Sequence, residues 1–336
     1  MDWGQSYSAQ WKVFRVNRST WADAEELKSI DEVSVSRTAD GSLLESGSME
    51  LSGEFRSDYY RIVMVAEQGG EVTRVDVATL LFDVTGGNIN YGRTVHNVDG
   101  FSVLYPASKT TILAGEYAPK GVDGAEYAAE LLRDAVNAPV SVEGSFTLND
   151  YLVHDIGSSV LEAVWNVLEA GNFVMQIDGR GVIHIKPMPA DPSLIIDNSS
   201  LRIMMSEISF STDISEVPNR YIVIVENNKT VAVNNDPESV ISINRRGYCV
   251  DYVDESPTAV NGETLSAYAN RRLKELSVEK EEKTYKREYA ADVNLYAIVR
   301  ASIEGMTGDY RIESQTIECG KGITVSEKAV KEVPLW

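Results

Sequence analysis

The order of hydrophobic patterns along the chain constrains the possible fold more than any other feature. Residues 6–113 carry short alternating runs of apolar and polar side chains, separated by Gly, Asn and Asp. Helical spacing of apolar residues follows between residues 125 and 168, and alternation returns after residue 199. Alternation with a period of two predicts strands, whereas spacings of three and four predict helices. We therefore expect a mainly β protein in which two strand-rich blocks flank a small α/β insert.

The clearest strand pair of the first block surrounds Gly69 and Gly70. Alternating runs precede and follow these glycines, over residues 60–65 and 72–84. A Gly-Gly pair between two such runs is typical of a tight β-hairpin. Short strands separated by turns favour a barrel or a sandwich. We therefore expect a first β domain, a barrel or a sandwich, at residues 1–114.

The helices of the insert follow a segment that is rich in Gly and Pro, residues 115–124, where the hydrophobic period also changes. Such a change predicts a domain boundary. A first helix is expected over residues 125–136. The second helix is clearer, because Ser159 and Glu162 have capping-box spacing and Gly171 follows as a C-cap residue.

A β-hairpin is expected to complete the insert. Residues 173–177 and 182–185 are apolar or alternating, and Asp178-Gly179 lies between them. Asp-Gly is a preferred sequence for a tight hairpin turn. The two helices and this hairpin together predict an α/β insert domain at residues 115–194.

The last block returns to strands and contains one helix. Residues 220–225 and 230–233 alternate around a polar turn, and residues 262–278 have helical spacing. The charged residues 279–283 are interpreted as a solvated run or a helix tail. We expect a second β domain with an internal helix at residues 195–336. The sequence contains no residue-level repeat between the two blocks.

Composition limits the possible partners. At 336 residues the chain is long enough for two or three domains. It contains 51 Asp and Glu against 31 Lys and Arg, which gives a net charge of -20. Tight binding to a phosphate backbone needs clustered cations. We therefore expect no specific nucleic-acid binding, and the acidic charge is also compatible with a role in solubility alone.

Cellular location is predicted from the cysteines and from the hydrophobic segments. Cys249 and Cys319 are too few for a disulfide framework, which suggests folding in a reducing cytoplasm. The N-terminus lacks the basic and apolar regions of a signal peptide. No run approaches the ~18 apolar residues of a membrane helix, so we expect no stable membrane insertion.

The histidines do not form a catalytic pattern. His154, Asp155 and Ser158 are triad residue types, but neighbours in sequence rarely orient one another as a triad requires. No Gly-x-Ser-x-Gly elbow is present. His184 lies on an alternating strand and His96 is isolated, so no pair has the spacing of a zinc site.

We therefore predict no catalytic residue, no cofactor site and no metal ligand, and we expect that the chain is not an enzyme. Cys319-Gly320-Lys321-Gly322 is not a P-loop, because the first glycine and the following helix are missing. A glycosidase-like carboxylate pair stays open, since 51 acidic residues will contain some suitable pair by chance.

Two short motifs carry a resemblance to a known family. Gly308, Tyr310, Ile312 and Ser314 form a late alternating strand, and a helix with the sequence Ala-Tyr-Ala-Asn-Arg-Arg-Leu at residues 267–273 precedes it. With the order of blocks described above, the chain resembles the baseplate or tail-tip hub proteins of long-tailed bacteriophages, prophages and contractile injection systems. The resemblance covers nearly the whole chain.

This resemblance implies a structural role. Hub proteins of the family form a homotrimer in which each subunit supplies two tube-like β domains, which implies that the blocks at residues 1–114 and 195–336 are tube-like β-barrel domains. The resulting ring joins the tail tube to the tip and lets DNA pass. The implied partners are the tail tube or distal tail protein, the tape measure protein and tip or spike proteins, in a virion tail assembled in the host cytoplasm. The family shares no catalytic site, and a fused hydrolase module is not expected after Trp336.

Two other functions stay open beside the hub. A carbohydrate-binding or adhesion module of the tail tip would need an aromatic cleft, and a cell-wall hydrolase would need a carboxylate pair. Tyr59, Tyr60, Tyr91 and Tyr105 are candidates for such a cleft. For a hub, we expect few basic side chains on the channel wall, because cations there would bind the passing phosphates. The arginines to which this expectation applies are Arg61, Arg74, Arg93, Arg220, Arg300 and Arg311.

Overall fold

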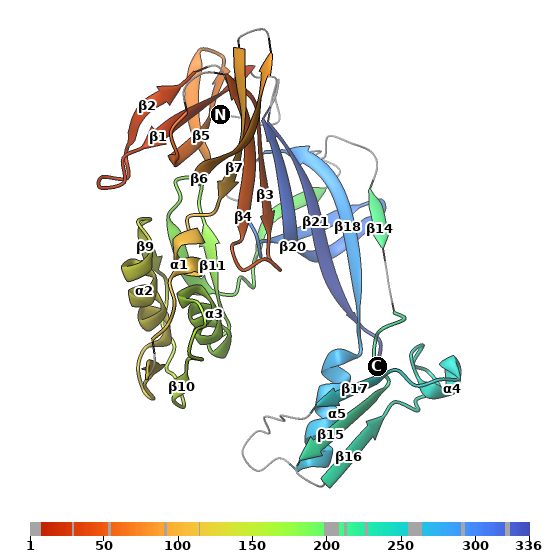
Figure 1. Cartoon of the computed structure of the whole chain (residues 1–336). Coiled ribbons are helices and arrows are strands. Elements are labelled where there is room, and N and C mark those ends of the chain that lie inside the picture. Colours follow the sequence, from red (N-terminus) through yellow and green to blue (C-terminus); the bar gives the residue numbers. More distant parts are fainter. Residues whose placement is uncertain are drawn as a thin grey trace. The chain divides into compact units, whose positions relative to one another are not determined.

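The computed structural model is mainly β, with 53% of residues in strands and 15% in helices. It describes residues 8–28, 30–52, 55–90, 93–113, 115–197, 208–211, 214–225, 228–254, 264–289, 293–319 and 323–336. The helices are α1 (Tyr105–Lys109), α2 (Gly124–Ala135), α3 (Val160–Ala170), α4 (Ile243–Arg246) and α5 (Leu265–Leu276) (Figure 1).

The strands up to the end of the insert are β1 (Ser8–Val16), β2 (Asp23–Leu27), β3 (Ile30–Thr38), β4 (Glu45–Ser52), β5 (Asp58–Gln68), β6 (Glu71–Asn90), β7 (Arg93–Phe101), β8 (Tyr117–Ala118), β9 (Val140–Val142), β10 (Leu152–Val153), β11 (Phe173–Ile177) and β12 (Ile183–Pro187). The later strands are β13 (Pro192–Asp197), β14 (Ser209–Ser211), β15 (Arg220–Val225), β16 (Asn228–Val233), β17 (Asp251–Asp254), β18 (Val278–Glu288), β19 (Ile298–Ile303), β20 (Met306–Cys319) and β21 (Ile323–Pro334).

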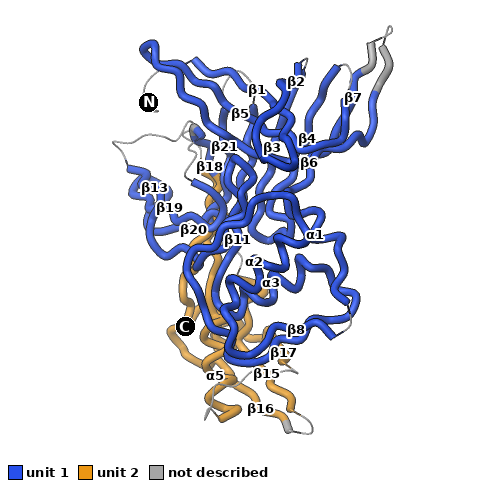
Figure 2. The backbone as a smooth tube through the Cα atoms, turned by 90° about the vertical axis from the view of Figure 1, so that its left-hand side faces the viewer, with its two compact units in different colours: residues 1–207, 285–329 blue, residues 208–284, 330–336 orange. Residues whose placement is uncertain are grey.

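The chain divides into two compact units. The first comprises residues 1–207 and 285–329, and the second comprises residues 208–284 and 330–336 (Figure 2). Strands β18 and β21 continue from one unit into the other. These boundaries differ from the predicted domains 1–114, 115–194 and 195–336, which stay a prediction about domain organisation.

The hairpin of the first strand block forms as its glycines predict. Strands β5 and β6 pair antiparallel, and Gln68 lies opposite Glu71. Gly69 and Gly70 between them have φ angles of 59° and 88°. A two-residue turn with two positive φ angles follows the twist of the flanking strands, and glycine adopts it without a steric penalty. One correction concerns the end of this block: the segment around Pro106 forms helix α1, not a strand.

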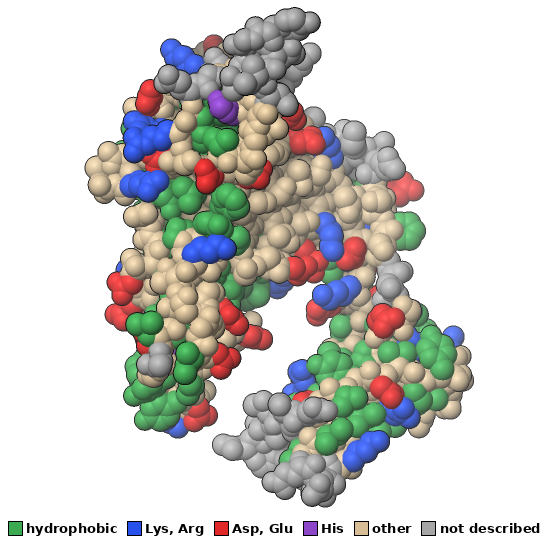
Figure 3. Space-filling model, viewed as in Figure 1, with side chains coloured by type: hydrophobic (Ala, Val, Ile, Leu, Met, Phe, Trp, Pro, Cys, Tyr) green, Lys and Arg blue, Asp and Glu red, His purple; other side chains and the backbone are tan. Residues whose placement is uncertain are grey.

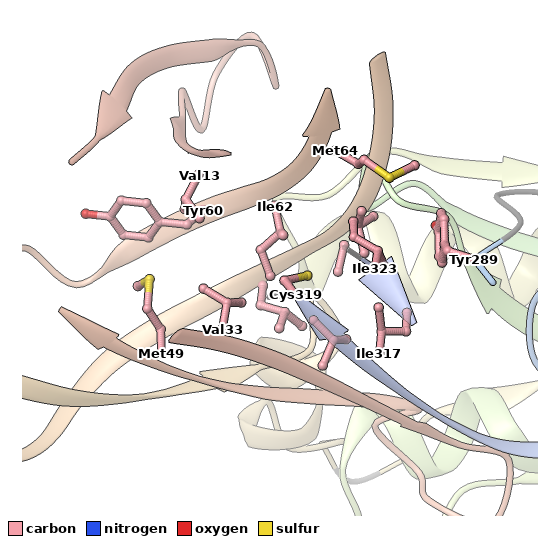
Figure 4. Packing of buried hydrophobic residues seen from close by; sticks show 14 of the residues in the cluster. Val13, Val33, Met49, Tyr60, Ile62, Met64, Tyr289, Ile317, Cys319 and Ile323 are labelled. Atoms are coloured by element: carbon pink, nitrogen blue, oxygen red, sulfur yellow. The ribbon is translucent and has the colours of Figure 1, made fainter. Parts of the chain in front are cut away.

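Strands of both predicted blocks share one sheet, in the order β14-β18-β21-β20-β3-β4-β7-β6-β5-β1-β2. Strand β20 pairs with β3 from Ser314 opposite Thr38 to Cys319 opposite Val33. Figure 4 shows Val33, Ile62, Cys319 and Ile323 near one another in the core beside these strands. Strand β19 also pairs with β20, and β13 pairs with β19, so the sheet branches at β20. Among the described strands we find no closed barrel.

Both predicted helices of the insert are present. Asp123 caps α2 by accepting a hydrogen bond from the Ala125 backbone N–H, and Ser159 caps α3 by accepting from that of Glu162. Gly171 is the C-cap residue, but the positive φ angle of 55° belongs to Asn172. Strands β11 and β12 then pair antiparallel from Phe173 to Ile177.

The turn between β11 and β12 packs against the strands of the first block. A Cβ atom on Gly179 would lie 1.8 Å from the Asp76 carbonyl oxygen, so only glycine allows this approach. The Thr79 hydroxyl donates a hydrogen bond to the Gly179 carbonyl oxygen, and the Trp21 indole N–H donates one to the Arg180 carbonyl oxygen. Trp21 itself has a φ angle of 55°, an uncommon conformation for a bulky residue. The turn therefore joins the insert to the sheet.

The second unit is built around a small sheet with the order β16-β15-β17. Helix α5 packs on one face of it, and the shared core contains Tyr221, Val223, Tyr268, Ala269 and Leu273. The helix therefore lies within the predicted helical segment at residues 262–278. Residues 226 and 227 of the predicted turn lie outside the described residues.

The charged residues 279–283 do not form a helix tail, and one of them is buried although Lys280 is exposed. These residues belong to strand β18, and the Lys283 side chain is only 8% exposed. Its ammonium group lies 2.9 Å from the Glu281 carboxylate and 5.0 Å from the centre of the Phe210 ring. Strand β14 pairs alongside, with Phe210 opposite Lys283. Ion pairing and a cation–π contact thus compensate for the burial of this lysine.

Candidate functional site

His154 contributes to packing and does not form a catalytic triad. Its Nε2 atom lies 3.0 Å from the Tyr127 hydroxyl, and the two rings stack. The Ser158 hydroxyl donates to the Asp155 carbonyl oxygen at 2.7 Å. Burial lowers the pKa of His154, which opposes protonation of the imidazole. The structure therefore places these three sequence neighbours in separate local contacts.

The other two histidines lie in strands. His184 on β12 lies between two carboxylates, with Nε2 3.2 Å from Asp178 and Nδ1 3.4 Å from Glu143. His96 lies on β7 opposite Leu51. Among the described residues, no three His, Cys, Asp or Glu side chains form a group that could hold a metal ion.

A buried ionic network joins the N-terminal and C-terminal strands of the first unit. Arg287 on β18 donates through Nε and Nη2 to the two carboxylate oxygens of Glu327 on β21, at 2.7 and 2.5 Å. Both side chains are fully buried. The Gln315 amide on β20 donates to Glu327 at 2.6 Å, and the Arg37 guanidinium reaches the Gln315 carbonyl oxygen at 3.5 Å.

The Arg37 end of this network is a second buried pair. Its Nε atom donates to Glu45 on β4 at 2.7 Å, and its Nη2 atom donates to the Val77 carbonyl at 2.7 Å. Burial raises the pKa of Glu45, although the Arg37 charge opposes this shift. For Arg287, burial acts to lower the pKa and the Glu327 carboxylate acts to raise it. The effect of the carboxylate is the larger, so the pKa of Arg287 is raised. The network therefore keeps charge inside the sheet by close pairing.

The arginines considered for a channel wall are mostly engaged with acidic side chains. Arg300 makes two hydrogen bonds to Asp309, and Arg220 makes two to Asp251. Arg74 donates to both Asp23 and Asp76. Arg61 is buried and donates to Asp23. Arg311 donates to the backbone carbonyl oxygens of Pro189 and Tyr296. The side chain of Arg93 is not described.

The described tyrosines among those considered for a glycan cleft, Tyr59, Tyr60 and Tyr105, do not line a common one. Tyr59 and Tyr60 are 1% and 3% exposed. Tyr105 is half-buried and stacks on Phe101, and Tyr91 lies outside the described residues. A shallow pocket does touch Tyr60, and its other lining residues are Arg15, Glu25, Leu27, Phe55 and Arg56.

Sequence reasoning missed a group of exposed apolar side chains on the insert. Tyr117, Tyr151, Val153 and Ile156 are 48% to 76% exposed, and Leu113 is 69% exposed. They lie in Gly- and Asp-rich connections outside the predicted helices and hairpin. Large apolar residues at such positions are the signal that could have identified them.

No helix in the described part of the chain has the length and apolar character that a membrane span requires.

The fold is that of known phage tail proteins. No family model matches the chain, and no curated protein matches its sequence. A tail protein from Neisseria meningitidis superposes with a TM-score of 0.66 and 11% identity, over 97% of each chain. The prophage MuSo2 tail protein from Shewanella oneidensis superposes with a TM-score of 0.65 and 11% identity, over 96% of this chain and 98% of that chain. The prophage tail protein gp18 from Listeria monocytogenes superposes with a TM-score of 0.51 and 12% identity, over 94% of each chain.

These similarities are in fold and extend over nearly the whole chain, which agrees with the family resemblance that the late strand and the preceding helix indicated. The chain has the fold of phage tail proteins.

Proposed function

We propose that this chain is a structural protein of a phage tail, and more closely a hub at the baseplate or tail tip. The observation that carries the proposal is the match in fold to two tail proteins, which covers at least 96% of this chain in both comparisons. A match over both strand blocks and the insert is more specific than a match to one common β motif.

The hub would act as a closed homotrimer. Each copy would contribute two tube-like β domains, residues 1–114 and 195–336, with the insert at 115–194 between them. In the described sheet of a single copy, β2 and β14 end the main path and β13 ends the branch, and strands at the edge of a sheet have unpaired backbone groups. Heterologous contacts between copies can close such a sheet into a ring.

DNA would pass through this ring without binding tightly to it. A duplex carries one phosphate per ~1.7 Å of its axis, so a wall of unpaired cations would retain it. The pairing of Arg74, Arg220 and Arg300 with aspartates supports this part of the proposal. The hub would need no catalytic residue, cofactor or metal, and it would bind the tail tube or distal tail protein, the tape measure protein and tip or spike proteins.

Assembly in the presence of a partner tests the proposal. The full chain should be purified alone and with the tail tube or distal tail protein from the same genome, and light scattering and negative-stain microscopy should follow. We expect rings with threefold symmetry in the mixture, even where the chain alone is a monomer. A chain that remains monomeric with each tail protein, or rings of another symmetry, would contradict the hub.

The carbohydrate-binding alternative predicts a different result. An adhesin should bind cell-wall glycans through an aromatic cleft, but burial of Tyr59 and Tyr60 removes two of its candidate residues. Glycan arrays on the purified chain would test it directly. Release of muropeptides that depends on one carboxylate would instead indicate a hydrolase.

A further inference from the structure

The exposed apolar side chains of the insert lie on two paired segments. Strands β8 and β10 are antiparallel, with Val153 opposite Tyr117. The pairing extends toward α3, where the Ile112 backbone N–H donates to the Ser158 carbonyl oxygen and Thr111 bridges to Ser159. The segments 111–118 and 151–159 therefore run side by side. We call their exposed apolar residues, Leu113, Tyr117, Tyr151, Val153 and Ile156, the insert patch.

The pleat of the strands places part of the insert patch on one face. Tyr151 and Val153 are two residues apart, and Tyr117 is directly across from Val153. The rings of Tyr117 and Tyr151 lie 5.8 Å apart. Figure 3 shows hydrophobic side chains gathered at the end of the insert where β10 is labelled in Figure 1, with acidic side chains beside them.

The insert patch has a firm base. The opposite face of the strands carries Ala118 and His154, which are both buried. The His154 ring stacks on Tyr127 of α2, and its backbone N–H donates to the Glu116 carbonyl oxygen. The apolar residues are therefore held outward by the same contacts that bury their neighbours. A preformed surface loses little conformational entropy when a partner binds.

The charges beside the insert patch are mainly acidic. Glu116 precedes Tyr117, Asp150 precedes Tyr151, and Asp155 precedes Ile156. Lys120 is the one cation within residues 111–120 and 150–159, and its ammonium group lies 3.4 Å from Asp150. Glu116 alternates with Tyr117 along the strand and Asp150 is paired with Lys120, but Asp155 adjoins Ile156 and Figure 3 shows further acidic side chains nearby, so the surroundings of the insert patch are net acidic. Acidic charge beside apolar side chains favours a partner that combines apolar groups with cations.

We propose that the insert patch is a docking surface for another protein, which presents apolar side chains flanked by lysine or arginine. A second copy of this patch would bring the same net acidic surroundings, so self-association would be repulsive. An anionic membrane surface would be repelled for the same reason. The Tyr117 and Tyr151 rings are tilted by 56°, so they do not form the flat aromatic platform that a sugar would stack on. The proposal rests on the insert patch and is independent of the hub function.

Two synthetic peptides provide a direct test. Both would be 18-residue amphipathic helices with the same leucine face, one with lysines and one with glutamates on the polar face, and both carry a fluorophore. Binding to the full chain would be measured by anisotropy at ~0.15 M salt, where the Debye length is about 8 Å. We expect the lysine peptide to bind and the glutamate peptide not to bind.

Variants separate the insert patch from general acidity. V153S/I156S removes apolar surface without changing charge, and we expect it to weaken binding of the lysine peptide by about tenfold or more. The control V72S/I195S changes two exposed apolar residues elsewhere, which are 65% and 59% exposed, and should bind as the original chain does. E116Q/D155N keeps the apolar surface and should also weaken binding, with a smaller dependence on salt.

Four results would overturn the proposal. Equal binding to V153S/I156S would show that the net acidity of the chain is sufficient. Equal binding of the glutamate peptide would show that charge plays no part. A dimer of the original chain that V153S/I156S abolishes in light scattering would identify a second copy as the occupant. Binding to anionic vesicles that is lost in the same variant would identify a membrane.

Discussion

Substitution of Glu327 tests whether the buried ionic network stabilises the first unit. Arg287 and Glu327 form a two-point pair with side chains that are 1% and 0% exposed. Arg300 and Asp309 form a pair of the same geometry, at 2.7 and 2.8 Å, with side chains that are 55% and 45% exposed. The two pairs therefore differ mainly in burial, and D309N is a matched control for E327Q.

The expected cost of E327Q follows from the charge that it leaves behind. The change keeps the side chain close in size but leaves the Arg287 guanidinium in the core without a counterion. Breaking a buried pair in this way costs about 3–5 kcal/mol of unfolding free energy. An exposed pair contributes about 0–1 kcal/mol, because water and salt screen both charges. E327Q should therefore destabilise the unit at least several times more than D309N.

Urea unfolding followed by tryptophan fluorescence would measure this difference. Trp11, Trp21 and Trp165 belong to the same unit as the buried pair. The double variant R287M/E327L removes both charges and should recover much of the lost stability, since an apolar replacement leaves no unpaired ion. Similar midpoints for E327Q and D309N, or a double variant as unstable as E327Q, would refute the reasoning.

Three further predictions concern single residues. G179A should lower the unfolding free energy by about 2–4 kcal/mol, because its Cβ would meet the Asp76 carbonyl, whereas G86A has open space and should be near neutral by the same urea assay. Burial lowers the pKa of His154 in the folded chain. Below pH ~6.5, this residue is therefore protonated more readily in the unfolded chain than in the folded chain. Stability should fall as the pH drops from 7 to 5, by at most about 1.4 kcal/mol per pH unit from this group, and H154Q should remove that part of the pH dependence. Burial raises the pKa of the Cys319 thiol to about 12 while Cys249 is exposed, so a thiol reagent should modify only Cys249 in the native chain and both after unfolding.

Local patterns with a single physical solution were predictable from the sequence. The capping residue Ser159 and the turn glycines Gly69 and Gly70 have the positions in the structure that their chemistry requires. Helix α1 was missed, although Pro106 in its first turn is a typical helix-start signal. Long-range pairing was not predictable: nothing in the local pattern indicates that β20 pairs with β3 more than 270 residues away.

Burial of charge was the other feature that local patterns concealed. Residues 279–283 contain only Glu and Lys, which suggests a solvated segment. In strand β18 alternate residues face opposite sides, and Lys283 is buried against Phe210. Phe210 is more than 70 residues away in sequence, so no local signal connects the two. The same holds for Arg37 and Gln315, which meet only after the sheet has formed.

The relation of this protein to nucleic acid depends on where its cations lie more than on its net charge. A chain with a charge of -20 could still concentrate free arginines on one surface. The structure instead joins Arg220 to Asp251 and Arg300 to Asp309 through two hydrogen bonds each, in partly exposed positions. A phosphate would have to displace a carboxylate from each of them, so the counterion release that drives DNA binding would be offset. For the proposed hub, arginines paired in this way would bind a passing duplex less tightly than free arginines would.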